Sequence, residues 1–295
     1  MVTRALVLGG GGVVGIAWET GVLKGLRDGG VDPNAADLVV GTSAGSVVGS
    51  QVRGGLSLDE LYAQQSTPMP QSEQLPMGQD MEKLVAIFTK WAQAPAMTEA
   101  LCAEIGRLAL EAKTDSEERW LAALRAGLVK SDDWPEQRLV VTSVDAETGA
   151  FKTWDRDAGV PMLAAIASSC AVPGMFPPVT VAGRRYIDGG VRSGTNADIA
   201  AGSDVAIIVA PIGGSDQGIG GIARRQLDAE ADSLRASGSI VEVILPDAAA
   251  MEAFGPNLMD PARRTPAAEA GLRQGAEAAT RLRDSWQAAV QSTAS

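Results

Sequence analysis

Two short apolar segments near the start of the chain each run into a glycine-rich turn and then into a helix-compatible segment. The first covers residues 4–8 and meets Gly9, and the second covers residues 37–40 and meets Gly41. A strand, a glycine turn and a helix, repeated twice within about fifty residues, are typical of parallel strands joined by helical crossovers. The sequence therefore predicts an α/β fold with a parallel sheet.

The pattern changes after the second unit. Residues 57–134 read as a helical insertion, because apolar positions recur there at helical spacing. Further strands are predicted at 138–145, 151–154, 204–210 and 240–245, and further helices at 162–168, 222–236 and beyond 268. We expect one domain over residues 1–295, with the insertion at about 57–134 and a helical C-terminal tail at about 263–295. One sheet would then gather the motifs at 9–15, 41–45 and 188–190.

The chain contains no histidine. This excludes every Ser-His-Asp and Cys-His mechanism and most zinc and non-haem iron sites. The two cysteines, Cys102 and Cys170, are too few for a disulfide scaffold and wrongly spaced for a thiolate metal site. We expect no metal and no cofactor, so carboxylates would have to carry out any proton transfer.

Charge and hydropathy restrict the partners. The chain has 36 acidic and 25 basic residues and a net charge of −11, which disfavours a nucleic-acid partner. The apolar run at 5–8 ends in four glycines and is too short for a secretory signal, and no stretch approaches the roughly 20 apolar residues of a membrane span. We expect a cytoplasmic protein that contacts membranes, if at all, only transiently and at their surface.

A serine motif follows the second strand. Residues 41–45 read Gly-Thr-Ser-Ala-Gly, which fits G-x-S-x-G between a strand and a helix. Gly41 and Gly45 allow a sharp turn that would expose the Ser43 hydroxyl at the edge of the sheet. Ser43 is thus a candidate nucleophile. The alternative is that Thr42 and Ser43 only cap the following helix.

A nucleophilic serine needs a base, and without histidine that base must be a carboxylate. Asp188 stands in the most unusual setting of the acidic residues, because it follows a short strand and precedes Gly189 and Gly190. An ordinary Asp-Gly turn is the alternative interpretation of this position.

The first glycine turn, residues 9–15, offers consecutive backbone N–H groups at the start of a helix, which suits an anion or a developing oxyanion. Gly10, Gly12 and Gly15 also fit the dinucleotide fingerprint. That fingerprint expects an acid at the end of the second strand, where this chain has residues 41–43, Gly-Thr-Ser, so nucleotide binding is disfavoured.

Four segments in order, at residues 9–15, 41–45, 167–178 and 188–190, together resemble the patatin-like phospholipases. The resemblance implies a three-layer α/β/α fold with a mainly parallel central sheet. It also implies a catalytic dyad of Ser43 as nucleophile and Asp188 as general base. Gly10, Gly11 and Gly12 would supply the N–H groups of the oxyanion hole.

The implied function is a serine acyl hydrolase that cleaves fatty-acyl esters of phospholipids or lysophospholipids through an acyl-enzyme, so the expected partner is a lipid or acyl-ester substrate. The chain departs from the family at Val14, where an arginine is usual. Two alternatives remain: a catalytically silent member that binds lipid or protein, and an acyltransferase that passes the acyl group to an alcohol.

Two further features have structural interpretations. The insertion places Met81, Leu84, Val85, Phe88 and Trp91 on one helical face, which predicts a helix packed on the core, with a lid or membrane-contact surface as the alternative. Cys170, inside the third segment, is expected to be a small buried thiol.

Overall fold

The computed structural model describes residues 3–68, 75, 78, 80–94, 96–213 and 218–291. One eight-stranded sheet runs through this part of the chain, with the order β5-β6-β3-β2-β1-β7-β8 and β4 paired to β3. Its strands are β1 (Arg4–Leu8), β2 (Leu38–Gly41), β3 (Leu139–Asp145), β4 (Phe151–Trp154), β5 (Val179–Val181), β6 (Arg184–Asp188), β7 (Val205–Val209) and β8 (Ile240–Ile244).

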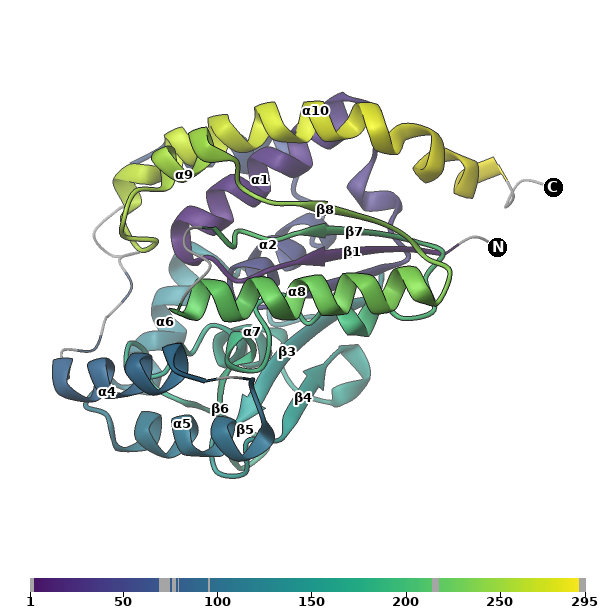
Figure 1. The fold of residues 1–295 in the computed structure, drawn as a ribbon. Helices are drawn as coiled ribbons and strands as arrows, with labels where there is room; N and C mark the ends of the chain where they lie inside the picture. Colours follow the sequence, from purple (N-terminus) through teal and green to yellow (C-terminus); the bar gives the residue numbers. More distant parts are fainter. Residues whose placement is uncertain are drawn as a thin grey trace.

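Helices cover both sides of this sheet (Figure 1). They are α1 (Gly12–Asp28), α2 (Ala44–Arg53), α3 (Leu58–Gln65), α4 (Met81–Ala92), α5 (Glu99–Glu111), α6 (Glu117–Gly127), α7 (Met162–Ser169), α8 (Gly218–Ala236), α9 (Ala248–Phe254) and α10 (Arg264–Gln291).

The central strands β3, β2, β1, β7 and β8 are parallel, whereas β4, β5 and β6 pair in the antiparallel sense at one edge. The carboxyl ends of β1 and β2 therefore lie side by side, with Leu8 paired to Gly41. The antiparallel strand β6 brings Asp188 opposite Ser143 of β3. This topology gathers the predicted motifs at one edge of the sheet.

The side chains of β1, which point alternately to the two faces of the sheet, show that both faces are buried. Leu6 and Leu8 point into the larger core, which includes side chains of α1, α2, α6, α7 and α10. Ala5 and Val7 point into a second core, which includes Leu227 of α8. Successive side chains of a strand face opposite sides, so two covered faces give the predicted α/β/α layers.

The predicted insertion carries helices α3 to α6 in its described part. The prediction that one face of α4 packs on the core is wrong in part: Ile87 is buried, whereas Met81 is 62% and Val85 is 59% exposed. Phe88 and Trp91 are half-buried against a small third core. The apolar stripe of α4 is wider than the contact available to it, so its first turns face outward.

The predicted tail is α10, which begins at Arg264 and lies along α1 (Figure 1). Glycines make this contact close: a Cβ added at Gly25 would lie 2.3 Å from the Leu272 carbonyl oxygen, and one added at Gly271 would lie 2.2 Å from the Trp18 carbonyl oxygen. The two backbones touch, so α10 is part of the packed core. Residues 292–295 of the predicted tail lie outside the described residues.

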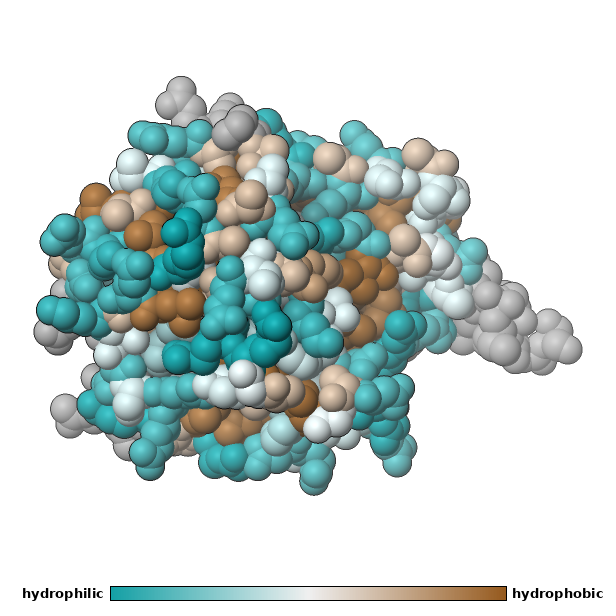
Figure 2. Space-filling view, turned by 90° about the horizontal axis from the view of Figure 1, so that it is seen from below, coloured by the Kyte–Doolittle hydropathy of each residue, from teal (hydrophilic) through white to brown (hydrophobic). Residues whose placement is uncertain are grey.

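In the described part of the chain, no helix combines the length and the apolar character needed to cross a membrane. The face turned toward the reader in Figure 2 carries apolar side chains in separate patches, with hydrophilic side chains between them.

Candidate active site

Ser43 lies at the turn between β2 and α2 with φ 52° and ψ −118°. A residue with a side chain rarely adopts such a backbone conformation, which is strained. The flanking glycines are required by close contacts: a Cβ at Gly41 would lie 2.5 Å from Ser46 Cα, and a Cβ at Gly45 would lie 2.1 Å from the Leu8 carbonyl oxygen. The sharp turn expected from the glycines is present.

Three side chains hold the backbone of this strained serine. The Ser43 N–H donates to Ser169 Oγ at 2.9 Å, and its carbonyl accepts hydrogen bonds from Ser46 Oγ at 2.6 Å and from Cys170 Sγ at 3.3 Å. Cys170 is buried, as predicted, and burial raises the pKa of its thiol. Sequence reasoning did not identify Ser169, because only the folded chain brings the end of α7 to the turn.

Asp188 ends β6 and is 3% exposed. Its Oδ1 accepts a hydrogen bond from the Gly190 N–H at 2.7 Å. Its Oδ2 is buried and has no hydrogen bond of good geometry among the described residues, although the Ser43 hydroxyl is close enough to lower the pKa of this carboxyl. Burial has the larger effect and raises the pKa of Asp188 to about 7. Catalytic hydrogen bonds in general are often long or poorly aligned before substrate binds.

The glycine loop lies against Ser43. A Cβ at Gly10 would lie 3.4 Å from Ser43 Cβ and 4.0 Å from Ser43 Oγ. The Gly10 N–H donates to the Gly194 carbonyl at 2.9 Å, a hydrogen bond that competes with its predicted role as an oxyanion donor. The N–H groups of Gly11 and Gly12 make no hydrogen bond to the described residues. They remain free to bind an oxyanion, whereas Gly10 allows the loop to lie close to Ser43.

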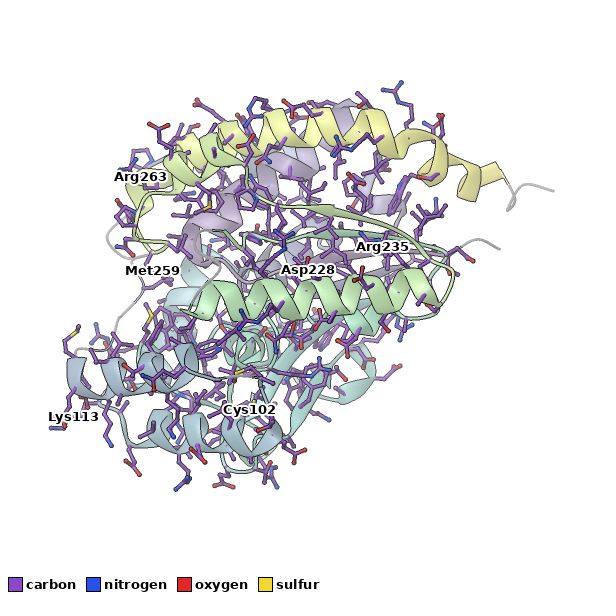
Figure 3. The ribbon with its side chains drawn as sticks, in the orientation of Figure 1. Cys102, Lys113, Asp228, Arg235, Met259 and Arg263 are labelled. Carbon is purple, nitrogen blue, oxygen red and sulfur yellow. The ribbon has the colours of Figure 1, made fainter. Side chains whose placement is uncertain are left out.

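A segment from the C-terminal part of the chain, residues 257–260, covers the glycine loop; we call it the strap. The Leu258 carbonyl accepts a hydrogen bond from the Val14 N–H at 3.0 Å. A Cβ at Gly12 would lie 2.9 Å from Met259 Sδ. Met259 lies at the end of the molecule where α10 begins (Figure 3). The sequence carried no signal for the strap. The Leu258 carbonyl of the strap binds the N–H of Val14, the residue where the sequence departs from the usual arginine.

Asn196 connects the turn at Ser43 to the loop that follows Asp188. It has φ 50°, and its Nδ2 donates to Thr42 Oγ1 at 3.0 Å and to the Ser193 carbonyl at 2.9 Å. Thr42 Oγ1 also lies 2.9 Å from Thr142 Oγ1 of β3. This buried network fixes the two loops relative to each other, and it was missed because it joins residues remote in sequence.

Two cavities adjoin the glycine loop. The first, about 30 Å³, touches Ser43 and has no charged side chain among its described lining residues, which include Trp120, Phe176 and Met259. The second and larger, about 260 Å³, has a mixed apolar and polar lining and shares Val13, Ile16 and Leu128 with the first. Its described polar lining comprises Gln51, Gln64, Gln65, Thr67, Lys130 and Arg264, with no acidic residue.

Among the described residues, no group of three or more cysteine, aspartate or glutamate side chains could hold a metal ion. Besides the side chains that hold its backbone, the polar groups near Ser43 include the Asp188 carboxyl and the N–H groups of the glycine loop. This arrangement can activate a hydroxyl and stabilise an oxyanion.

The sequence matches a known protein family, and the fold is similar to that of solved structures. The family model described as patatin-like phospholipase matches residues 6–201. The fold is similar to that of VipD from Legionella pneumophila, with a TM-score of 0.46 and 13% identity, covering 96% of this chain and 67% of that chain. It is also similar to that of the type III effector protein ExoU, with a TM-score of 0.43 and 14% identity, covering 98% of this chain and 59% of that chain. No curated protein sequence matches. Because the family model matches well over half of its residues, the chain belongs to the patatin-like phospholipase family.

Proposed function

We propose that this protein is a serine acyl hydrolase that cleaves fatty-acyl esters of phospholipids or lysophospholipids through a dyad of Ser43 and Asp188. One observation carries the proposal: a serine on a strained turn lies beside a buried carboxyl group whose pKa burial raises to about 7. Burial makes this carboxylate a much stronger base than an exposed one.

In the proposed reaction, Asp188 accepts the hydroxyl proton as Ser43 Oγ attacks the ester carbonyl carbon. The carbonyl oxygen becomes an oxyanion and accepts hydrogen bonds from the N–H groups of Gly11 and Gly12, each worth about 3 kcal/mol to the transition state. The tetrahedral intermediate expels the alcohol, which takes the proton from Asp188. Water then gives its proton to Asp188 and attacks the acyl-enzyme, and Ser43 regains the proton as the fatty acid leaves.

A base is most effective when its pKa lies near the working pH. Since burial raises the pKa of Asp188 to about 7, the carboxyl is largely ionised just above neutral pH and can still accept a proton efficiently. Below about pH 7 it is protonated and cannot activate Ser43. We expect kcat/KM to rise with pH up to about 7 and then to level off.

The two cavities suggest how a substrate would lie. The apolar cavity beside Ser43 suits an acyl chain. The larger cavity next to it carries Lys130, Arg264 and several amide side chains and suits the alcohol part with its head group. At about 30 Å³, the apolar cavity has room for little more than one water molecule. An acyl chain must therefore displace part of the cavity wall. The strap contributes Met259 to this wall and is held to the glycine loop by the hydrogen bond from the Val14 N–H to the Leu258 carbonyl.

A fluorophosphonate probe tests the proposal directly, because it reacts only with an activated serine. We expect the wild type and Ser50→Ala to be labelled and to hydrolyse p-nitrophenyl esters, and Ser43→Ala to do neither. Ser50 is a matched control, since it is also a buried serine of α2 but donates only to the Val47 carbonyl of its own helix, at 2.8 Å. A folded wild type that is not labelled would contradict the hydrolase and leave the silent lipid- or protein-binding alternative.

Hydrolysis of a panel of phospholipids and lysophospholipids then defines the substrate. Mass spectrometry of the products in the presence of added alcohols distinguishes hydrolysis from acyl transfer, because a transferase would yield a new ester.

A further inference from the structure

The two members of the proposed dyad come from strands that are not neighbours. Ser43 follows β2 and Asp188 ends β6, and β3 lies between these two strands in the sheet. Adjacent strands lie about 4.8 Å apart, so the ends of β2 and β6 are separated by about 10 Å. Asp188 Oδ2 has no hydrogen bond of good geometry among the described residues, so contacts outside the dyad have to set the separation of the two side chains.

The carboxamide group of Asn196 contacts the chain on both sides of this separation, and the side chain is 0% exposed. Its Nδ2 donates to Thr42 Oγ1 at 3.0 Å, and Thr42 directly precedes the nucleophile. The same nitrogen donates to the Ser193 carbonyl at 2.9 Å and lies 3.3 Å from the carbonyl oxygen of Gly189, which directly follows the base. One amide nitrogen thus connects the two loops that carry the dyad.

The orientation of this carboxamide group is fixed by an arginine. Asn196 Oδ1 accepts a hydrogen bond from Arg192 Nη1 at 2.7 Å. A guanidinium group can only donate, so this contact identifies the accepting atom as the amide oxygen and turns the amide nitrogen toward the two loops. Arg192 is held in turn by an ion pair with Asp198 at 2.6 Å.

The simplest alternative is that asparagine is present only for its backbone conformation. Asn196 has φ 50°, in the left-handed region, which asparagine tolerates better than most residues. Glycine adopts this region at least as readily and has no side chain to bury. Because both polar atoms of the buried carboxamide group have partners, the side chain has a role that glycine could not supply.

We propose that Asn196 is a positioning residue for ester hydrolysis. Its carboxamide group holds the turn at Ser43 and the loop after Asp188 at the separation at which the carboxyl group can take the hydroxyl proton. This inference rests on the proposed hydrolase function. A misplacement of reacting groups by about 1 Å can slow a reaction about 10²-fold, so loss of this connection should slow the chemical step more than it weakens substrate binding.

Two substitutions remove the two sides of the connection. Asn196→Gly keeps the left-handed backbone and removes the carboxamide group, whereas Thr42→Val keeps the shape of the side chain and removes the oxygen that accepts from Asn196. Ala182→Gly is the matched control, because Ala182 also has a positive φ, 49°, but is exposed in the turn between β5 and β6.

The measurements are kcat and KM on a short p-nitrophenyl ester, the rate of fluorophosphonate labelling, and Tm. Well below Tm, we expect kcat and the labelling rate to fall about tenfold or more in Asn196→Gly and in Thr42→Val, with KM changed less than about threefold. The double variant should be slower than the slower single variant by no more than about twofold, because both substitutions remove the same connection. Ala182→Gly should keep kcat within about twofold of the wild type.

Four outcomes would contradict these expectations. Wild-type kcat in a folded Asn196→Gly variant would overturn the positioning role while leaving the hydrolase intact, and so would wild-type kcat in Thr42→Val if Asn196→Gly does not fold. Effects that multiply in the double variant would also overturn it, because the two side chains would then act independently. A wild type without Ser43-dependent labelling would refute the hydrolase itself, and this inference with it.

Discussion

Replacing Asp188 by asparagine should remove activity and at the same time stabilise the fold at neutral pH. Asparagine can still accept the Gly190 hydrogen bond through its carbonyl oxygen but cannot take a proton from Ser43. We expect kcat to fall by about 10² to 10⁴-fold, the usual contribution of a general base. The variant gains stability because the wild type carries a buried carboxyl group that must ionise for catalysis, whereas asparagine carries no charge.

The magnitude comes from the pKa of Asp188, which burial raises from an ordinary value of 3.8 to about 7. Between these two values the folded protein holds a proton that the unfolded chain has lost, so the stability of the wild type falls as pH rises. A shift of about 3 pH units corresponds to about 4 kcal/mol, fully developed above about pH 7 and absent below about pH 4. Asp188→Asn does not undergo this loss of unfolding free energy, because asparagine does not ionise.

Urea denaturation of the wild type and Asp188→Asn between about pH 5.5 and 8 tests this reasoning. The difference in unfolding free energy should grow by about 2 kcal/mol between about pH 5.5 and 7 and then stay constant. Ser50→Ala serves as the control, since it should follow the wild-type pH dependence. A difference between wild type and Asp188→Asn that stays the same across this range would refute the raised pKa.

Three other substitutions address the helices and cavities around the site. Gly271→Leu should lower the unfolding free energy by about 3 kcal/mol or more in urea denaturation, because a Cβ at this position meets the Trp18 carbonyl. The control, Glu269→Leu on the exposed side of α10, should change the unfolding free energy by less than about 1 kcal/mol. Equal effects of the two substitutions would contradict the backbone contact between α1 and α10. Met259→Ala should enlarge the apolar cavity and shift kcat/KM toward longer p-nitrophenyl esters, and an unchanged chain-length profile would remove Met259 from the acyl site. Lys130→Gln should raise KM about threefold to tenfold for lipids with an anionic head group but not for neutral esters. Lys113→Gln, outside the larger cavity, is the control, and an equal rise of KM for both substrates would argue against a head-group site.

Much of the layered fold could be predicted from local signals. The two N-terminal strand-turn-helix units correspond to β1 with α1 and β2 with α2, although α1 begins at Gly12, earlier than the apolar periodicity indicates. Periodicity and glycine turns act over a few residues, so they are readable without knowledge of the fold. The absence of histidine likewise directs attention to carboxylates before any geometry is known.

Contacts between distant segments were less predictable. Arg184 and Arg185 open β6, where Arg184 pairs with Asp145 and Arg185 donates to the Pro178 carbonyl. β6 is paired with β3 on one side and with β5 on the other, so these distant segments stabilise a strand that its own composition does not favour. The exposed apolar face of α4 likewise depends on distant segments, because a helix buries an apolar face only where another part of the chain packs against it.

The sequence by itself determined the residue types of the site: a serine between glycines, a glycine-rich loop, and an aspartate before two glycines. Only the tertiary structure decided how these groups act. Burial raises the pKa of Asp188, the Gly194 carbonyl occupies the N–H of Gly10, and the strap covers the glycine loop. A sequence specifies which groups are present, whereas desolvation and hydrogen-bond partners depend on atoms brought together from far along the chain.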